Sequence, residues 1–305
     1  MGLGVMGLRH ARVLRALEMR YEVAGGYDPC LEAQTPDGMD RLTSADEAIA
    51  RADVVVVATP VETHARIAAR ALAAGRHVLV EKPICATTAE ANALLASARG
   101  GARLFVGHSE RFNPVVRALA RLVSADEILR MDLRRVGRIR PGAGRALVNL
   151  GVHDLDLGAY LGGGEIALRG AVGPASDLEG EDFAHVLFST AHGGAGHAFV
   201  DGASHLRERA ILLVTARWIY HGDLLGHRLL RSGRASSARA DVPLRLEEPL
   251  LAQASALADA LDGKGPRELA TGVDGARAVD LAERAAACLA PDASVRSSRF
   301  QGAPG

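Results

Sequence analysis

The feature that most limits the fold of this chain is a run of four valines, Val54–Val57, that precedes Ala58-Thr59-Pro60. Consecutive β-branched residues favour a strand, and because none of the four is polar, both faces of that strand must be buried. Strands buried on both faces are typical of parallel sheets with helices on either side. The run therefore predicts an α/β protein, and Pro60 marks the end of the strand because proline cannot donate to a sheet ladder.

The segments around this run alternate between strand and helix. Predicted strands cover residues 21–27, 53–58, 78–80 and 103–107, and predicted helices cover residues 46–52, 63–74 and 87–98. Thr87 is placed to cap the last of these helices, with Glu90 three residues later completing a capping box. This alternation with short connections predicts a doubly wound parallel sheet of the Rossmann type.

Glycines in the pattern G-x-G-x-x-G occupy residues 2–7, immediately before a further helical pattern. They permit a tight turn and a close approach of the backbone to a pyrophosphate at the helix N-terminus. Asp28 follows about 20 residues later, where a carboxylate accepts the ribose hydroxyls and repels a 2′-phosphate. The alternative for Asp28 is a turn residue before Pro29. The spacing favours the ribose role, and therefore NAD rather than NADP.

One element of this fingerprint is missing from the sequence. A strand should precede the first glycine, and only Met1 stands before Gly2. Either the start is truncated or misassigned, or the fold tolerates the loss. We favour truncation, because this strand is normally the central one of the sheet.

A charged pair, Glu81-Lys82, ends the apolar strand at residues 78–80 and is followed by Pro83. Ligands bind at the carboxyl edge of an open α/β sheet, so Lys82 is placed to donate a charged hydrogen bond to a substrate oxygen. The alternative is a surface lysine at a strand end, since lysine is mostly exposed.

A second polar group lies in a helix predicted for residues 149–160. Asn149, His153 and Asp156 are spaced four and three residues apart, so they share one helix face. Because their neighbours are apolar, this face indicates a site rather than core packing.

Together these motifs resemble the Gfo/Idh/MocA family of nicotinamide-dependent oxidoreductases. The resemblance rests on residues 2–7, His10, Asp28, residues 58–60, His64, residues 81–83, and residues 107–114, which read Gly-His-Ser-Glu-Arg-Phe-Asn-Pro. It covers nearly the whole chain except the first strand. It implies a Rossmann domain at residues 1–112, followed by a substrate-binding and oligomerisation domain at residues 113–305. That second domain is of the α+β class, with a large, mostly antiparallel open sheet.

The resemblance also implies an activity: hydride transfer between NAD and a secondary alcohol of a sugar, a sugar nucleotide such as a UDP-amino sugar, or a cyclitol. In the family the lysine lies near the nicotinamide and the substrate hydroxyl, so Lys82 takes that role. His153 matches the family histidine, whereas Asn149 stands where the family usually has Asp. That difference, with the missing strand, motivates an alternative: a non-catalytic dinucleotide-binding sensor or partner subunit.

The site expected from these motifs has three parts. The catalytic residues are Lys82, His153 and Asn149. The cofactor contacts are Gly2, Gly4, Val5, Met6, Gly7, Asp28, Thr59, Pro60, His64, Glu81 and Lys82. The substrate contacts are Lys82, Arg111, Asn149, His153 and Asp156. No metal site is expected.

Residues beyond 113 show a different pattern. Helices are predicted at residues 114–123, 250–261 and 273–289. An outer strand is predicted at 128–136, and further strands at 166–172, 183–189, 195–200, 210–214, 218–220 and 224–230. An exposed loop is predicted at 232–240 and a loose tail after 291. Arg134, Arg135, Arg138 and Arg140 form either a solvated face or a phosphate contact. The family's open sheet commonly makes oligomer contacts, which implies a homodimer or homotetramer.

Composition excludes several partners. Basic and acidic residues balance at 36 each, so no net field attracts nucleic acid or an anionic membrane. The three cysteines, Cys30, Cys85 and Cys288, have neither disulfide-framework nor metal-ligand spacing. Without a membrane-spanning apolar run or a leader pattern, we expect a cytoplasmic protein that acts on a small carbohydrate.

Overall fold

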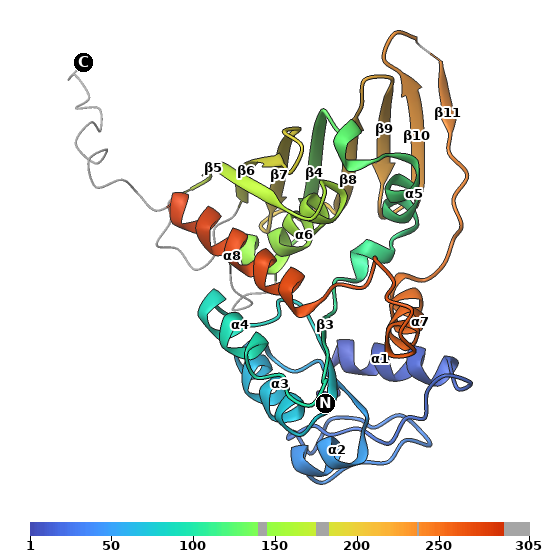
Figure 1. The fold of residues 1–305 in the computed structure, drawn as a ribbon, viewed down its shortest axis with the longest axis vertical. Helices are drawn as coiled ribbons and strands as arrows, with labels where there is room; N and C mark the ends of the chain where they lie inside the picture. Colours follow the sequence, from blue (N-terminus) through green and yellow to red (C-terminus); the bar gives the residue numbers. More distant parts are fainter. Residues whose placement is uncertain (140–144, 175–182, 237, 290–305) are drawn as a thin grey trace, which may run out of the picture.

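The computed structural model describes residues 1–139, 145–174, 183–236 and 238–289, and it contains two sheets (Figure 1). The smaller sheet is parallel, in the order β1 (Val54–Val57), β2 (His77–Val80), β3 (Leu104–Val106). Helices α1 (Val5–Ala16), α2 (Ala45–Arg51), α3 (His64–Ala73) and α4 (Thr88–Leu95) accompany it. The Rossmann-type parallel sheet predicted from the valine run is confirmed.

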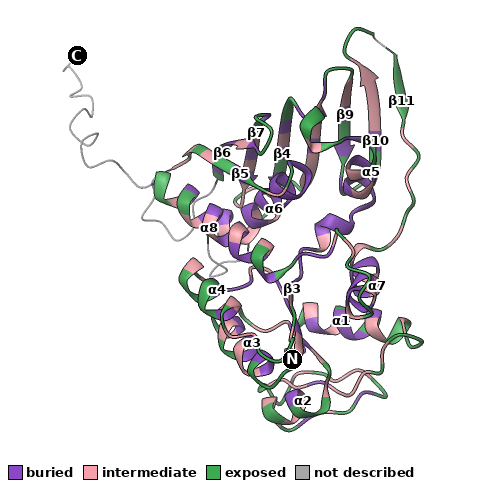
Figure 2. Cartoon of the chain, viewed as in Figure 1, coloured by how far each residue is buried: buried purple, intermediate pink, exposed green. Residues whose placement is uncertain are grey.

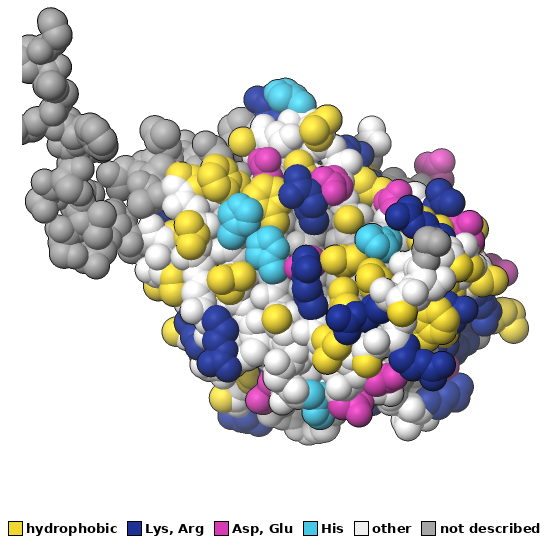
Figure 3. Space-filling view, turned by 90° about the horizontal axis from the view of Figure 1, so that it is seen from above, with side chains coloured by type: hydrophobic (Ala, Val, Ile, Leu, Met, Phe, Trp, Pro, Cys, Tyr) yellow, Lys and Arg dark blue, Asp and Glu magenta, His cyan; other side chains and the backbone are white. Residues whose placement is uncertain are grey.

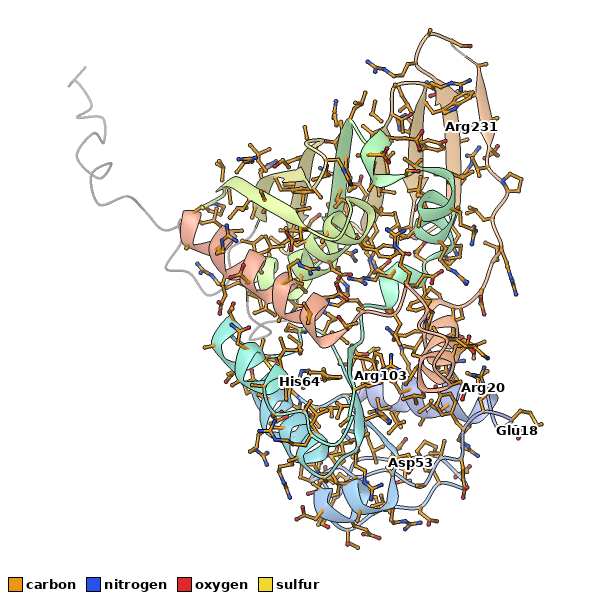
Figure 4. The ribbon with its side chains drawn as sticks, in the orientation of Figure 1. Glu18, Arg20, Asp53, His64, Arg103 and Arg231 are labelled. Atoms are coloured by element: carbon orange, nitrogen blue, oxygen red, sulfur yellow. The ribbon has the colours of Figure 1, made fainter. Side chains whose placement is uncertain are left out.

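The valine run is covered on both sides, as its composition requires. Val55 and Val57 pack with α3 in one hydrophobic cluster. Val54 and Val56 pack against a second cluster built around α7 (Pro249–Leu261). A helix from the far end of the chain therefore completes the N-terminal core. Figure 4 shows Arg20, which lies beyond α1, beside α7, where it forms ion pairs with Asp259 and Asp262.

The predicted strand at residues 21–27 does not form. Only an isolated bridge between Gly26 and Arg41 remains there. Met1 occupies the free edge of β1, donating its amine to the Val56 carbonyl oxygen at 2.6 Å and accepting the Ala58 N–H at 2.9 Å. A cavity of about 450 Å³ lies between residues 20–27 and 53–56. A strand needs a ladder partner, and this cavity separates residues 21–25 from β1.

The larger sheet has the strand order β11-β10-β9-β8-β4-β7-β6-β5. Its members are β4 (Arg130–Val136), β5 (Ile166–Val172), β6 (Phe183–Thr190), β7 (Ala195–Asp201), β8 (Glu208–Val214), β9 (Trp218–Asp223), β10 (Arg228–Gly233) and β11 (Arg239–Asp241). Only the pair β4–β7 is parallel, so the mostly antiparallel open sheet is confirmed.

Three local predictions in this region are wrong. The strand at 128–136 is central rather than outer, because alternation reveals a one-sided strand without revealing its neighbours. The strand predicted at 224–230 is a turn followed by β10, and part of the loop at 232–240 pairs as β10 with β11. The predicted tail after residue 291 lies outside the described residues.

Helices α5 (Pro114–Leu122), α6 (Val152–Leu161) and α8 (Gly272–Cys288) lie on one face of the large sheet (Figure 1). Figure 2 shows α6 buried along its length, between the sheet and α8. Short helical turns are η1 (Val61–Thr63), η2 (Ser109–Phe112), η3 (Ala125–Glu127) and the π-helical η4 (Leu147–Gly151). Seen from above, the molecule mixes hydrophobic, basic, acidic and histidine side chains (Figure 3).

Candidate active site

The glycine motif forms a turn into α1. Gly2 has a φ of 81°, and a Cβ there would lie 2.5 Å from the Ala58 carbonyl oxygen. A Cβ on Gly7 would overlap the carbonyl of Gly2. Gly4 is the N-cap and has nothing within 4 Å of a Cβ position, and no side chain caps the helix. The first turn of α1, which includes the exposed Val5 and the half-buried Met6, is therefore open to an anion.

Asp28 lies against this turn. Its Oδ2 accepts the N–H of Leu3 at 2.7 Å, and its Oδ1 accepts the N–H of Cys30 at 2.9 Å. Arg41 holds the same loop by donating to the carbonyl oxygens of Asp28 at 2.9 Å and Cys30 at 2.7 Å. A carboxylate has about four acceptor sites, so Asp28 retains capacity for ribose hydroxyls.

His64, at the start of α3, connects the ends of β1 and β2. It is buried, with Nδ1 2.9 Å from the Pro83 carbonyl oxygen and Nε2 2.8 Å from that of Thr59 (Figure 4). Both neighbours are acceptors, so a ring nitrogen that carries a proton donates to the carbonyl oxygen beside it. His64 therefore holds the loops that carry Thr59, Pro60 and Lys82.

Glu81 contacts α1. Its Oε1 lies 2.7 Å from His10 Nε2, and both residues are buried. Its Oε2 accepts the Lys82 N–H at 3.2 Å, and a Cβ on Gly107 would lie 3.0 Å from the carboxylate. Glu81 thus fixes the end of β2 to the helix that follows the glycine turn.

Lys82 is half-buried, unlike a freely solvated surface lysine. Its Nζ donates to the main-chain carbonyl oxygen of Asn149 at 3.0 Å. The pKa of Lys82 is lowered to about 8: burial is the largest cause, Glu81 opposes the shift, and the cations Arg135 and Arg209 favour it. The Lys82–Pro83 peptide is cis. Near neutral pH the side chain is therefore a charged donor that is able to release its proton.

Asn149 and His153 approach from the start of α6. The sequence predicted one continuous helix from residue 149, but Asn149 lies in the π-helical turn η4, and α6 begins at Val152. Single π-helical turns often occur at functional sites. Burial, with Lys82 and Arg135, holds the pKa of His153 well below its usual value, so its imidazole is neutral at pH 7.

Arg111 and Asp156 are brought together by the fold. Arg111 donates from Nε and Nη2 to the two carboxylate oxygens of Asp156, at 2.8 and 2.5 Å, and both residues are buried. The guanidinium also lies 4.9 Å from the Tyr160 ring centroid and 3.5 Å from Asp274. The pair joins η2 to α6 behind Lys82 and His153.

A second buried charge cluster was not predicted. Arg135 contacts Asp154 at 2.8 Å and Glu110 at 3.3 Å, and Arg209 contacts Glu110 at 2.5 Å. Arg135 is almost fully buried, so it is neither solvated nor free for a phosphate. Arg134 instead pairs with Glu208, Arg138 contacts His205, and Arg140 lies outside the described residues.

Sequence reasoning also overlooked His108. It belongs to the segment that supported the family resemblance, yet its spacing from the other polar residues gives no signal. In the structure it is buried and its ring meets that of His153. In the part of the chain that the structure describes, no group of three His, Cys, Asp or Glu side chains is arranged to hold a metal ion, and no helix is long and apolar enough to cross a membrane.

Comparison with known proteins agrees with this geometry. Residues 1–108 match the family model described as oxidoreductase family, NAD-binding Rossmann fold (GFO_IDH_MocA). UDP-N-acetylglucosamine 3-dehydrogenase of Acidithiobacillus ferrooxidans is 31% identical over 194 residues, covering 60% of this chain and 59% of that protein. Inositol 2-dehydrogenase 2 of Saccharopolyspora erythraea is 33% identical over 206 residues, covering 61% and 60%. These alignments therefore span about three fifths of each curated relative.

Solved structures extend the match in space. The crystal structure of the same Acidithiobacillus ferrooxidans enzyme superposes with a TM-score of 0.83 at 25% identity, covering 95% of this chain and 96% of that one. Levoglucosan dehydrogenase in complex with NADH and levoglucosan has a TM-score of 0.81 at 19% identity, covering 95% of each chain, and this likeness concerns the fold alone.

The fold, a Rossmann-type domain followed by a second, mostly antiparallel sheet, is the fold of the oxidoreductases that this chain is similar to. The resemblance read from the motifs is confirmed: residues 1–108 match the Gfo/Idh/MocA family model, and the relatives include a UDP-N-acetylglucosamine 3-dehydrogenase and an inositol 2-dehydrogenase.

Proposed function

We propose that the protein is an NAD-dependent dehydrogenase that transfers a hydride between nicotinamide C4 and a secondary alcohol carbon of a sugar, sugar nucleotide or cyclitol. The observation that carries the proposal is the position of Lys82. It stands at the carboxyl end of β2, half-buried, with its Nζ 3.0 Å from the turn that leads to His153. This is the edge at which open α/β sheets bind their ligands.

The dinucleotide would be held by this chain's own groups. The open first turn of α1 binds the pyrophosphate, and Asp28 accepts hydrogen bonds from the ribose hydroxyls. Thr59 and Pro60, at the end of β1, line the path towards Lys82. The cofactor supplies the hydride chemistry, while the protein supplies orientation and charge.

Lys82 and His153 divide the chemistry at the alcohol oxygen. Lys82 hydrogen-bonds that oxygen and stabilises the negative charge that develops on it. His153, neutral at pH 7, takes the hydroxyl proton, and such general-base assistance contributes roughly 10²–10⁴ in rate. Asn149 orients the substrate through its dipole. Arg111 and Asp156 hydrogen-bond to each other, and the pair holds η2 against α6.

The choice of substrate class is supported by the relatives. Similar curated proteins include a UDP-N-acetylglucosamine 3-dehydrogenase and inositol 2-dehydrogenases. We further propose two domains, residues 1–112 and 113–305, a cytoplasmic location, and a homo-oligomer formed through the open sheet face, where Phe183 and Leu187 are exposed.

The test is to follow reduced-nicotinamide absorbance with purified protein, NAD or NADP, and a panel of UDP-sugars, inositols and free sugars. The proposal predicts turnover with at least one member and loss of that turnover in His153→Ala. Tight NADH binding without turnover across the whole panel would instead support a non-catalytic dinucleotide-binding protein.

A further inference from the structure

A buried histidine beside the site has no function in the mechanism above. His108 follows β3, is 1% exposed, and has no hydrogen-bond partner among the described residues at either ring nitrogen. Buried polar groups without partners are rare in folded proteins, because each loses its hydrogen bonds to water. The position of His108 therefore needs a physical reason.

His108 lies between two groups of different chemistry. On one side its ring meets the ring of His153 edge to face, with centroids 6.4 Å apart and an interplanar angle of 85°. On the other side its Nδ1 lies 3.7 Å from Oδ2 of Asp156. Nδ1 of His153 is also buried and, within the described residues, has no partner. His153, His108 and Asp156 thus form a row that runs from the half-buried to the fully buried part of the site.

The charges around His153 explain why this row of side chains matters for proton transfer. Besides burial, the charges that lower the pKa of His153 most are those of Lys82 and Arg135. His108 would add to them only if it were charged, and burial lowers the pKa of His108 itself, which keeps its ring neutral at pH 7. Asn149, one helical turn earlier, carries no charge. His153 must therefore accept a proton in surroundings dominated by cations, and a nearby negative charge would make that step easier.

Asp156 is the carboxylate placed to supply that charge. It acts on His108 directly, opposing the effects of burial, Arg111 and Lys82 on the pKa of His108, and Asp274 acts in the same direction as Asp156. Its orientation is fixed by Arg111, whose Nε donates to Oδ2, the oxygen that faces His108. Arg111 is in turn shared with Asp274, so the positive charge behind Asp156 is partly neutralised.

We propose that His108 is a positioning residue that couples Asp156 to His153. When His153 takes the alcohol proton, His108 accepts a hydrogen bond from the imidazolium through Nε2 and donates its Nδ1–H to Asp156. The proton remains on His153, and the carboxylate stabilises it through the intervening ring. This proposal rests on the proposed role of His153 as the base.

The first experiment is a proton NMR titration of His153, which needs no substrate. Its ring resonance is assigned by its disappearance in His153→Gln. In His108→Phe, which keeps a ring but removes both nitrogens, we expect the titration of His153 to move to lower pH. His108→Gln retains one acceptor and one donor, so it should restore most of the wild-type midpoint. His221→Phe, at an exposed position on β9, is the matched control.

The second experiment measures the pH dependence of kcat and kcat/KM with the best substrate. His108→Phe should lower kcat on the order of 10-fold, with KM little changed, and should move the acid limb to lower pH. A folded His108→Phe protein with an unmoved His153 titration would overturn the proposal. If the wild type is inactive, the proposed function fails, and the NMR titration still decides the coupling.

Discussion

At the scale of single residues, the chemistry of the site depends on the surroundings of each side chain as much as on its residue type. Lys82 and Lys264 are the two lysines of the chain, so they can be compared directly. Lys264 is exposed and pairs with Asp259 at 3.1 Å, whereas burial lowers the pKa of Lys82 to about 8. The same residue type thus provides a reactive group at one position and an ordinary surface group at the other.

This contrast predicts a difference in pH dependence. A lysine reacts with an acylating reagent only as the neutral amine, so Lys82 should become reactive as the pH rises through about 8. Peptide mass spectrometry of the two sites over pH 6–11 measures this, and saturating NADH should protect Lys82. Equal reactivity profiles at both lysines would contradict the assigned environment.

The pKa of Lys82 is lower in the folded protein than in the unfolded chain, so the free energy of unfolding depends on pH through this group. Between about 8 and the ordinary value of 10.5 the unfolded chain binds more protons at Lys82 than the folded chain does. The contribution of Lys82 to the free energy of unfolding should therefore rise with pH across this window. Urea unfolding at pH 8 and pH 10 should show a rise that is smaller in Lys82→Met, and Lys264→Met should behave as the wild type does.

Asp28 gives a prediction about cofactor choice. Asp28→Ser should weaken NAD binding by about 10-fold, because a hydrogen bond to a charged group contributes roughly 1.5–3 kcal/mol. It should also bring NADP affinity closer to that of NAD, because the repulsion of a 2′-phosphate is gone. Titrations of both cofactors measure this, with Asp53→Ser, at a fully exposed position, as the control. Tighter NADP than NAD binding by the wild type would contradict the assignment.

At the scale of elements, periodicity and turn chemistry predicted most helices and strands, and tertiary pairing decided the exceptions. Thr87 caps α4 as expected, accepting the Glu90 N–H at 3.2 Å, although Glu90 bonds to Ala86 rather than to Thr87. The segment at residues 21–27 has a strand composition but lacks a ladder partner. The π-helical turn at Asn149 could not be read from spacing, because a single π turn shifts the apolar pattern of a helix by only one residue.

The cavity beside β1 yields an element-scale prediction. An engineered extension of about six apolar residues before Met1 should pair along β1 and fill the space between residues 20–27 and 53–56. The melting temperature should rise by about 2 °C or more, since 1 kcal/mol moves the midpoint of a chain of this size by about that amount. An extension of the same length made of Gly and Ser is the control, and an equal effect of both would count against pairing in the cavity.

At the scale of the whole molecule, the helices near the end of the chain pack against the elements near its beginning. Helix α7 packs on α1 and β1, and the start of α8 packs on β3, with Gly272 and Gly275 in close contact with Leu104 and Val106. Such contacts join residues more than 150 positions apart, so no local pattern reveals them. The motifs did predict where Lys82 and His153 lie, because strand ends and helix faces follow from local sequence. They did not predict the pairing of Arg111 with Asp156, or His108, because those contacts exist only after the two sheets have assembled.

The most direct test of the central claim compares Lys82→Met with Lys264→Met. Both substitutions remove an ammonium and keep a long apolar stem. With the best substrate, we expect Lys82→Met to lower kcat by on the order of 10²-fold or more, while NADH affinity measured by fluorescence titration stays close to that of the wild type. Lys264→Met should match the wild type in both measurements. Wild-type turnover in Lys82→Met would contradict the proposed role of Lys82, because the ammonium at the end of β2 would then have no part in the reaction.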